Sequence, residues 1–495
     1  MKTVHSCSVA GYLLAAIIAH GESVPKTYDD AETATWHVPL ANAKVSPSFL
    51  TSSYFYARQV RPIFRSYPIY HPDREPAGYL EHLMTIEPEV LWDDEENRPS
   101  LKTEADWIQA GEVAYEAPTW PRPLEEMSHY RDAEWIEKMG LPVAADGTIP
   151  GVYFTVQERG AVGVGIFSCA TCHNRVDGEG QIFKAAQGNL PLARIEASET
   201  LMGLHGNKEE VLEYEFEYHG TPWIKEGPNA RIMEMTLEEY AATREAIPAG
   251  VYPNHNGSMF SPARIADLIG LKQRRYMDFT AHMRHRSPSD VMRFTDFHQW
   301  ESKYASFGPY QPQKIPDPEN EERYSDEQAY ALTLYLYSFE TPKSPHKVDA
   351  LARRGKAIFK EESCVKCHVP KTGYTNRKLT AVDGFKVPDN HPEKKNISRR
   401  RVHTDPTYGL MTRKGTGLYK IPSLTGLWNR GPFEHNGSIA TLEDWFDPRR
   451  LDDDYVPTGW KGPPGTKTRA VPGHEFGLDL SEEDKEALIA FLKTL

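Results

Sequence analysis

The feature that most constrains this chain is a short cysteine pattern that occurs twice. Residues 169–173 read Cys-Ala-Thr-Cys-His, and residues 364–368 read Cys-Val-Lys-Cys-His. Cysteines three positions apart are separated by about one helical turn, so both thiols and the following imidazole can lie on one side of that turn. Four of the five cysteines in the 495-residue chain occur in this pattern, and the fifth, Cys7, lies near the start.

The C-x-x-C-H pattern is the attachment signature of c-type haem. Each thiol forms a thioether bond to the porphyrin edge, and the adjacent histidine binds the iron as its proximal ligand. The sequence therefore predicts two covalently bound haem c groups, each carrying one iron. The predicted attachment residues are Cys169, Cys172, Cys364 and Cys367, and the predicted iron ligands are His173 and His368.

Other uses of paired cysteines fit less well. Zinc ribbons usually hold two C-x-x-C pairs about 15 to 20 residues apart, whereas nearly two hundred residues separate these two pairs. A thioredoxin-type dithiol needs a strand before a helix, and neither cluster clearly follows a strand. A disulfide within each cluster would leave the two histidines unexplained.

Residues 1–21 have the features of a secretory signal peptide. Lys2 and His5 precede an apolar run from Val9 to Ala19, which is shorter than the about 20 residues that a bilayer-spanning helix needs. Small residues stand where a cut after Gly21 requires them. A buried N-terminal helix is the alternative. We expect an exported protein, periplasmic or extracellular, whose mature chain has no membrane span.

Composition limits the partners and the fold class. Lys and Arg number 57 against 70 Asp and Glu, a formal charge of −13. Without a basic stripe, nothing in the sequence predicts binding to nucleic acid. Proline accounts for 38 of the 495 residues, a larger share than the usual value of about 5%. We therefore expect long ordered loops rather than a simple helical bundle.

An ungapped repeat predicts two related helices, at 325–339 and 481–495. Each segment begins with a serine that can cap a helix, continues with acidic residues, and then repeats Ala and Leu on one face. Each follows a C-x-x-C-H cluster by more than a hundred residues. A cytochrome c module ends in a closing helix packed against its opening helix, so the repeat predicts two tandem modules. Two unrelated amphipathic helices are the alternative interpretation.

We therefore expect a mainly α fold with two tandem cytochrome c-like helical modules, long proline-rich loops and an irregular N-terminal extension. A proline-punctuated linker at 341–345 separates the modules. Helical spacing at 352–359 leads into the second cluster, whereas the lead-in to the first, 162–167, is rich in glycine and less helical. The expected parts are the signal peptide (1–21), a loop-rich extension (22–150), a first module (151–340) with an insertion at 250–310, and a second module (346–495).

The C-terminal module resembles the bacterial di-haem cytochrome c peroxidase superfamily, which includes the di-haem rubber oxygenases. The resemblance covers 344–495 well and 160–340 in outline. It implies two c-haems within electron-transfer distance, one six-coordinate and one reactive. The segments that carry it are 419–428 (Tyr-Lys-Ile-Pro-Ser-Leu-Thr-Gly-Leu-Trp), 431–438 (Gly-Pro-Phe-Glu-His-Asn-Gly-Ser), 441–443 (Thr-Leu-Glu) and 473–481 (Gly-His-Glu-Phe-Gly-Leu-Asp-Leu-Ser).

The sixth ligand of the second haem has three candidates: His474, Met411 and His435. A thioether ligand would raise the reduction potential, and a second imidazole would lower it. The resemblance around 473–476 makes His474 the first choice. His435 is more typical of a residue that fixes a loop, and Glu434 stands where the peroxidases can have methionine.

For the first haem, the resemblance implies an iron that is open to a small ligand. Arg284 and Arg286 are candidates for polarising a bound oxygen species, and Trp428 or Trp300 for a position between the haems. One iron has one free position, so most of the histidines and methionines in this region must have other roles. The candidate sixth ligands are His255, Met259, His282, Met283, His285, Met292 and His298.

The expected function is electron transfer through covalently bound haem, and the resemblance favours a peroxidase- or oxygenase-type enzyme. The alternative is a non-catalytic electron carrier or redox subunit with both irons six-coordinate. A third interpretation makes residues 22–150 a docking surface. The expected partners are a redox protein or a small electron donor, together with peroxide or dioxygen. No acidic loop has a convincing calcium-ligand spacing.

Overall fold

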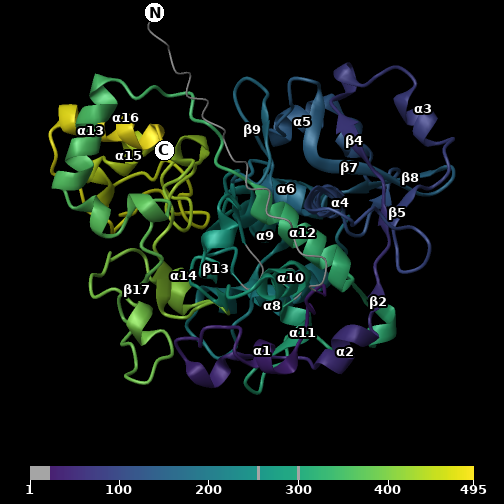
Figure 1. Ribbon diagram of the computed structural model, residues 1–495, viewed down its shortest axis with the longest axis horizontal. Helices are drawn as coiled ribbons and strands as arrows, with labels where there is room; N and C mark the ends of the chain where they lie inside the picture. Colours follow the sequence, from purple (N-terminus) through teal and green to yellow (C-terminus); the bar gives the residue numbers. More distant parts are fainter. Residues whose placement is uncertain (1–22, 254–256, 298–300) are drawn as a thin grey trace, which may run out of the picture.

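The computed structural model describes residues 23–253, 257–297 and 301–495. Helices take up 36% of the chain and strands 13%, which confirms the expected predominance of helix. Figure 1 shows residues after about 346 gathered on the left and the earlier residues in the centre and on the right. Within the described residues, no helix is both long and apolar enough to cross a membrane. The predicted signal peptide, Cys7, His255, His298 and Trp300 lie outside the described residues.

The structure has many short elements joined by long loops. The α-helices are α1 (Asp30–Ala34), α2 (Ser52–Ala57), α3 (Tyr79–Leu83), α4 (Glu104–Glu116), α5 (Ala133–Met139), α6 (Cys169–His173), α7 (Leu192–Leu201), α8 (Lys208–His219), α9 (Leu237–Glu245), α10 (Pro288–Phe297), α11 (Glu301–Tyr304), α12 (Asp326–Ser338), α13 (Ala350–Glu361), α14 (Thr407–Leu410), α15 (Leu442–Trp445) and α16 (Glu482–Lys493).

The strands form small sheets. One sheet has four strands in the order β4 (Ser66–Tyr70), β7 (Thr148–Glu158), β8 (Ala161–Gly165), β6 (Arg122–Pro123). The other sheets are pairs: β1 (Pro47–Phe49) with β15 (Ala305–Phe307), β2 (Gln59–Val60) with β16 (Glu322–Arg323), β3 (Ile63–Phe64) with β5 (Val90–Trp92), β9 (Arg175–Val176) with β10 (Ile182–Phe183), β11 (Val251–Tyr252) with β12 (Ala263–Arg264), β13 (Tyr276–Met277) with β14 (Met283–Arg284), and β17 (Leu379–Ala381) with β18 (Leu418–Lys420).

In residues 346–495, which we call the C-terminal half, α13 crosses α16 at a glycine. Asp349 caps α13, and Ser481 caps α16 with its side chain. Gly355 allows the two backbones to approach so closely that a Cβ atom there would lie 1.8 Å from the Ala487 carbonyl oxygen. Phe359 packs on Phe491 beside this crossing, with ring centres 5.4 Å apart. The predicted opening and closing helices of this half therefore form one packed pair.

The preceding part of the chain, up to residue 345, is called the N-terminal half. It contains the same kind of crossing between α4 and α12. A Cβ atom on Gly111 of α4 would lie 2.1 Å from the Ala331 carbonyl oxygen of α12. Thr103 and Asp106 form a capping box that starts α4. The sequence analysis missed this helix, which lies within 22–150 although it packs against a helix of the segment 151–340.

A β-hairpin separates α4 from the first cysteine cluster. Strand β7 pairs with β8 and with β4, and β8 corresponds to the glycine-rich lead-in at 162–167. All but the last two residues of β7 are buried, and the strand lies close against α6 at Gly151. The sequence analysis did not predict these strands.

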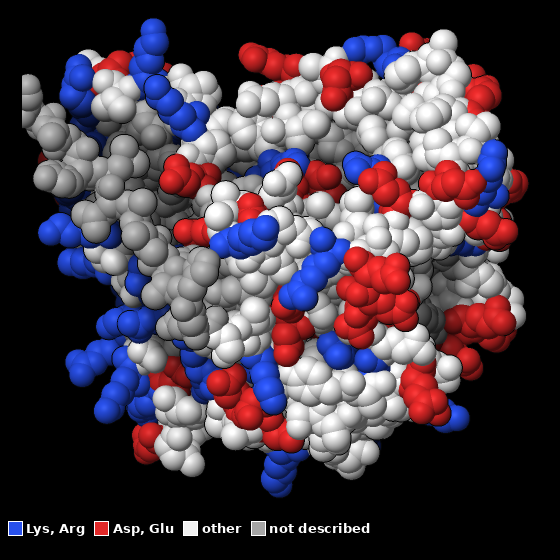
Figure 2. All heavy atoms as spheres, turned by 45° about the vertical axis from the view of Figure 1, so that its right-hand side comes forward, with Lys and Arg blue, Asp and Glu red and all other residues white. Residues whose placement is uncertain are grey.

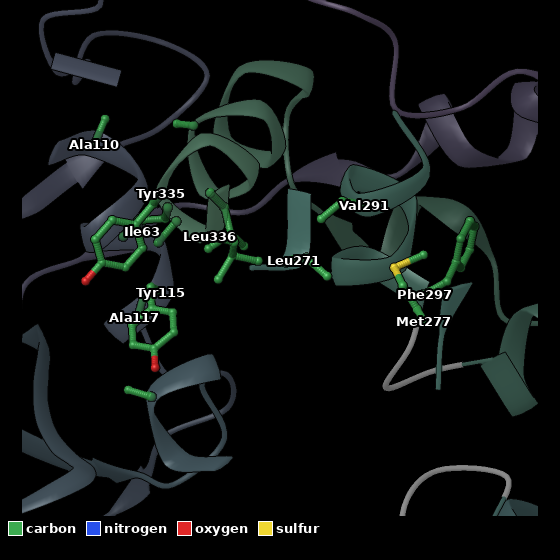
Figure 3. Close-up of a cluster of buried hydrophobic side chains, with 14 of the residues drawn as sticks. Ile63, Ala110, Tyr115, Ala117, Leu271, Met277, Val291, Phe297, Tyr335 and Leu336 are labelled. Atoms are coloured by element: carbon green, nitrogen blue, oxygen red, sulfur yellow. The ribbon is translucent and has the colours of Figure 1, made fainter. Parts of the chain in front are cut away.

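The largest hydrophobic cluster joins distant parts of the N-terminal half. It places α4 and α12 next to α10 and to residues around 271–283 (Figure 3). Tyr115 and Tyr335 meet edge to face within it, with ring centres 5.3 Å apart. Cys169, the first residue of α6, packs against the same cluster. The first cysteine cluster is therefore attached to the main core of the protein.

Replacement of Gly355 by alanine tests the helix crossing. The added methyl group would overlap the Ala487 backbone, so the two helices must separate. We expect Gly355→Ala to destabilise the C-terminal half by about 2 kcal/mol or more, measured by chemical denaturation of the haem-loaded protein. Gly178→Ala is the matched control, because a Cβ atom there meets nothing within 4 Å. Equal stability of the two variants would contradict this packing.

Candidate haem sites

The second cysteine cluster follows α13 after a tight turn. Ser363 adopts a left-handed backbone conformation with φ of 62°. The amide of His368 then donates to the carbonyl of Cys364 at 2.8 Å. This turn brings Cys364, Cys367 and His368 to one wall of a cavity of about 220 Å³. Most of the cavity wall is apolar, as a porphyrin face requires: Phe279, Phe359, Val402, Leu424, Leu427, Phe433, Leu442, Trp445, Phe446, Phe476, Leu488 and Leu492.

His368 and His474 face each other across this cavity. Their ring centres are 6.2 Å apart. An imidazole nitrogen binds a transition metal at about 2 Å, and its ring centre lies about 1 Å beyond, so two imidazoles on opposite sides of one metal have centres about 6 Å apart. The Nδ1 atom of His368 lies 3.0 Å from the carbonyl oxygen of Tyr374, which leaves Nε2 for a metal.

The loop that carries His474 is held from behind by a buried arginine. The Arg450 guanidinium donates to four backbone carbonyl oxygens, those of Trp445, Val471, Gly473 and His474, at 2.6–3.0 Å. His474 itself has a positive φ of 49°. Non-glycine residues rarely keep this conformation unless the surrounding structure holds it.

Protonation of His474 is disfavoured. Two causes lower the pKa of His474 to about 4: burial is the larger, and the nearby His368 is the second. Its Nδ1 atom is buried without a hydrogen-bond partner in the described structure. The neutral imidazole at ordinary pH is the form that binds a metal.

The other two candidate ligands of the second haem have different surroundings. Met411 directly follows α14 and is not among the residues that line the cavity. His435 does line it, but its ring stacks on Tyr419 at 4.7 Å and its Nδ1 atom lies 3.2 Å from the Glu434 carboxylate. The geometry therefore brings His474, and not Met411, opposite His368.

Four cationic side chains line the same cavity: the exposed Arg400 and the more deeply placed Arg264, Lys420 and Arg430. Burial, with repulsion from Arg274, lowers the pKa of Lys420 to about 7. Burial likewise lowers the pKa of Arg264 to about 10. A buried cation needs a counter-charge, and haem carries two carboxylates on one edge. The apolar wall, the facing imidazoles and these cations together fit a haem.

The first cysteine cluster forms helix α6. Ser168 and Thr171 make a capping box, and the Thr171 hydroxyl donates to the Gly151 carbonyl oxygen of β7 at 2.7 Å. Burial lowers the pKa of His173 to about 4 and raises the pKa of Cys169 to about 11. The Nδ1 atom of His173 is buried without a hydrogen-bond partner in the described structure. A neutral imidazole and two thiols are thus presented as the attachment chemistry needs.

The structure places the described candidates for the sixth ligand of the first haem in other roles. His282 Nε2 lies 2.7 Å from the buried Glu301 carboxylate, and His285 Nε2 lies 2.6 Å from the Tyr337 hydroxyl. Met259 belongs to a separate hydrophobic cluster and Met283 to the main one, while Met292 is buried on α10.

The arginines and the tryptophan predicted near the first haem also have defined positions. Arg284 forms an ion pair with Glu393 at 2.7 Å, and Arg286 forms one with Asp290 at 2.8 Å. Neither guanidinium is therefore unpaired. Trp428 of the C-terminal half packs edge to face on Phe183 of β10, with ring centres 5.6 Å apart. It lies where the two halves meet.

A buried carboxylate joins the two halves between the clusters. Asp267 contacts Arg274 at 2.7 Å and Arg430 of the other half at 3.3 Å. Burial alone would raise the pKa of Asp267, but the arginines outweigh it and lower the pKa to about 2. The two arginines are 156 residues apart, the same offset that relates the helix-capping Ser325 and Ser481.

Comparisons with known proteins found distant relatives of this chain. No protein-family model matches the chain. It is 27% identical over 210 residues to the methylamine utilization protein MauG of Paracoccus denitrificans. The match covers 37% of this chain and 53% of MauG, about half of that protein's length. This relative confirms the resemblance to the di-haem cytochrome c peroxidase superfamily.

The solved structures that align with this chain do so at low similarity. Hydrazine synthase of Kuenenia stuttgartiensis aligns with a TM-score of 0.30 and 14% identity, covering 58% of this chain and 87% of that one. A variant of the diheme peroxidase BthA of Burkholderia thailandensis aligns with a TM-score of 0.21 and 18% identity, covering 49% of this chain and 65% of that one.

Replacement of Asp267 by asparagine tests the junction between the halves. The change leaves Arg274 and Arg430 buried without their carboxylate, so we expect a loss of about 3 to 5 kcal/mol at neutral pH, measured by chemical denaturation. Because the pKa of Asp267 is lowered in the folded protein, its contribution is complete above about pH 4 and declines as the pH falls toward 2. The difference from the unaltered protein should therefore shrink below pH 4. A difference that grew on acidification would contradict this account.

Proposed function

We propose that this chain is an exported di-haem c-type cytochrome that acts as a haem-dependent oxidoreductase of the peroxidase or oxygenase type. The observation that carries the proposal is the facing pair His368 and His474 across an apolar cavity beside Cys364 and Cys367. The other C-x-x-C-H cluster, at residues 169–173, and the resemblance to the di-haem peroxidases support it. The number of haems, their covalent attachment and export are parts of the same proposal.

In this proposal the second haem is closed on both sides. Cys364 and Cys367 hold its edge, while His368 and His474 bind the iron. Tyr374 fixes the orientation of His368, and Arg450 fixes the loop of His474. Lys420, Arg264 and Arg430 neutralise the haem carboxylates. Two imidazole ligands favour a low potential, suited to relaying electrons.

The first haem is proposed to be the reactive one, held by Cys169 and Cys172 with His173 on its iron. The described candidates for its sixth ligand are engaged elsewhere, which favours an open position. When bound, haem supplies one-electron transfer and, at an open iron, reaction with peroxide or dioxygen. Trp428, at the contact between the halves, is proposed to lie between the two haems.

We also propose that each half is one cytochrome c module. The glycine crossings of α4 with α12 and of α13 with α16 support this assignment. The first module then starts at α4, inside the segment 22–150, and continues to about residue 340; the second covers 346–495. A non-catalytic carrier with two closed haems remains the second candidate function, because the closed second site suits both roles.

The spectrum of the ferric protein separates the two functions. We expect two haems per chain, with one low-spin and one high-spin signal in electron paramagnetic resonance, and turnover of peroxide with a reduced donor. Two low-spin signals and no turnover, also after partial reduction, would establish the carrier instead. Fewer than two haems would overturn the central proposal.

His474→Gly tests the sixth ligand of the second haem. We expect the low-spin signal of that haem to become high-spin, because an axial ligand is lost, and added imidazole to restore it. Met411→Ala is the control and should leave both signals unchanged. A low-spin signal that persists in His474→Gly and disappears in Met411→Ala would show that methionine is the ligand.

Lys420→Met tests the cationic end of the cavity. Reduction adds an electron next to this side chain, and a nearby cation stabilises the reduced form. We therefore expect the reduction potential of the second haem to fall in Lys420→Met and to change little in Lys420→Arg, measured by spectroelectrochemical titration. Equal potentials in all three proteins would show that Lys420 does not contact the haem carboxylates.

A further inference from the structure

The two halves of the chain differ in charge. Residues 346–495 carry 26 Lys and Arg against 20 Asp and Glu, whereas residues 1–345 carry 31 against 50. Figure 2 shows Lys and Arg gathered along the left-hand edge, where the C-terminal half lies, and many Asp and Glu over the right-hand part. This acidic protein thus has a basic region in residues 346–495.

The most basic part of this region surrounds the second cysteine cluster. A surface hollow is lined by Cys367 and by six exposed cations, with Asn376, Ile397 and Ser398 between them. We call these cations the basic rim. They come from the turn after α13, from the loop before β17 and from residues 394–400: Lys366, Lys378, Lys394, Lys395, Arg399 and Arg400.

The charges of the basic rim are little neutralised. Within the described residues, the one ion pair of the rim joins Lys394 to Asp389 at 2.9 Å, and Asp389 is fully exposed. Exposed pairs of this kind are weak and are screened by salt. The nearby Glu393 is occupied by Arg284 on its buried side. The rim therefore presents a positive field to an approaching molecule.

The basic rim lies directly above the second haem site. Cys367 and Arg400 line both the surface hollow and the haem cavity. The Arg400 guanidinium lies 4.0 Å from the ring centre of Phe476, which contacts His474 with ring centres 5.1 Å apart. The rim thus surrounds the place where the wall of the haem cavity, at Cys367 and Arg400, also lines the surface hollow.

We propose that an acidic electron-transfer protein docks on the basic rim and passes one electron to the second haem. The proposal rests on the haem binding proposed above. The reduced centre of the partner loses one electron and is oxidised, and the ferric iron between His368 and His474 becomes ferrous. No bond is formed or broken, and no proton is needed. Complementary charge raises the rate of such an encounter about 10- to 1,000-fold at low salt.

The experiment is stopped-flow reduction of the ferric two-haem protein without oxygen. The probe is a reduced plant-type [2Fe–2S] ferredoxin of net negative charge, whose potential of about −400 mV suffices to reduce a low-potential haem. Reduced methyl viologen, a small cation, is the second reductant. The variant is Lys378→Glu with Lys395→Glu. The control is Lys208→Glu with Lys225→Glu, which makes the same charge change at exposed positions of the N-terminal half.

We expect the rate constant with ferredoxin to fall at least tenfold in the rim variant at low salt, and to lose most of its salt dependence. The control should keep both the rate and the salt dependence, and methyl viologen should reduce all three proteins alike. An unchanged rate in the rim variant, or an equal loss in the control, would overturn the docking proposal. Failure of methyl viologen to reduce any haem would instead overturn the proposed haem function, and the docking proposal with it.

Discussion

The carboxylate of Asp267 is the contact on which the arrangement of the two halves depends. It binds Arg274 within its own half and Arg430 across the boundary, and all three groups are largely or fully buried. Burying a carboxylate costs free energy unless opposite charges lie beside it. The contacts of Asp267 with the two arginines therefore fix how the halves meet. Arg264 and Lys420 are also 156 residues apart, as the first residues of two corresponding segments, 264–274 and 420–430. The cations of the second cavity are therefore supplied by both halves.

Several elements were predictable because their chemistry is local. The two C-x-x-C-H clusters need no tertiary information, since five consecutive residues define each one. The helices α12 and α16 were predictable from a serine cap, an acidic first turn and helical spacing, which are properties of a single segment. The expectation for His474 came from resemblance, and the structure places its ring opposite His368; its role as ligand stays a prediction.

The missed elements depend on contacts far away in the chain. Helix α4 has weak apolar periodicity, because Gly111 and Ala110 face α12 and a small residue gives little hydrophobic signal. Strand β7 is buried on nearly all positions, so the alternation that identifies a half-exposed strand is missing. The role of Lys420 could not be predicted either, since its cavity is formed by segments from 264 to 492. The sequence similarity between residues 264–274 and 420–430 extends over only eleven positions, too few to identify a repeat without the structure.

Strand β7 covers the first cysteine cluster on one side, and this limits the size of the molecule that can reach the cluster from that side. Gly151 of β7 lies so close to α6 that a Cβ atom there would be 2.7 Å from the Thr171 Cα atom. A layer of sheet therefore stands between this cluster and solvent on that side. A protein cannot bring its own redox centre through such a layer, whereas a molecule of two or three atoms is limited only by the width of a channel. On that side, the covering therefore excludes a docking protein from the first cluster.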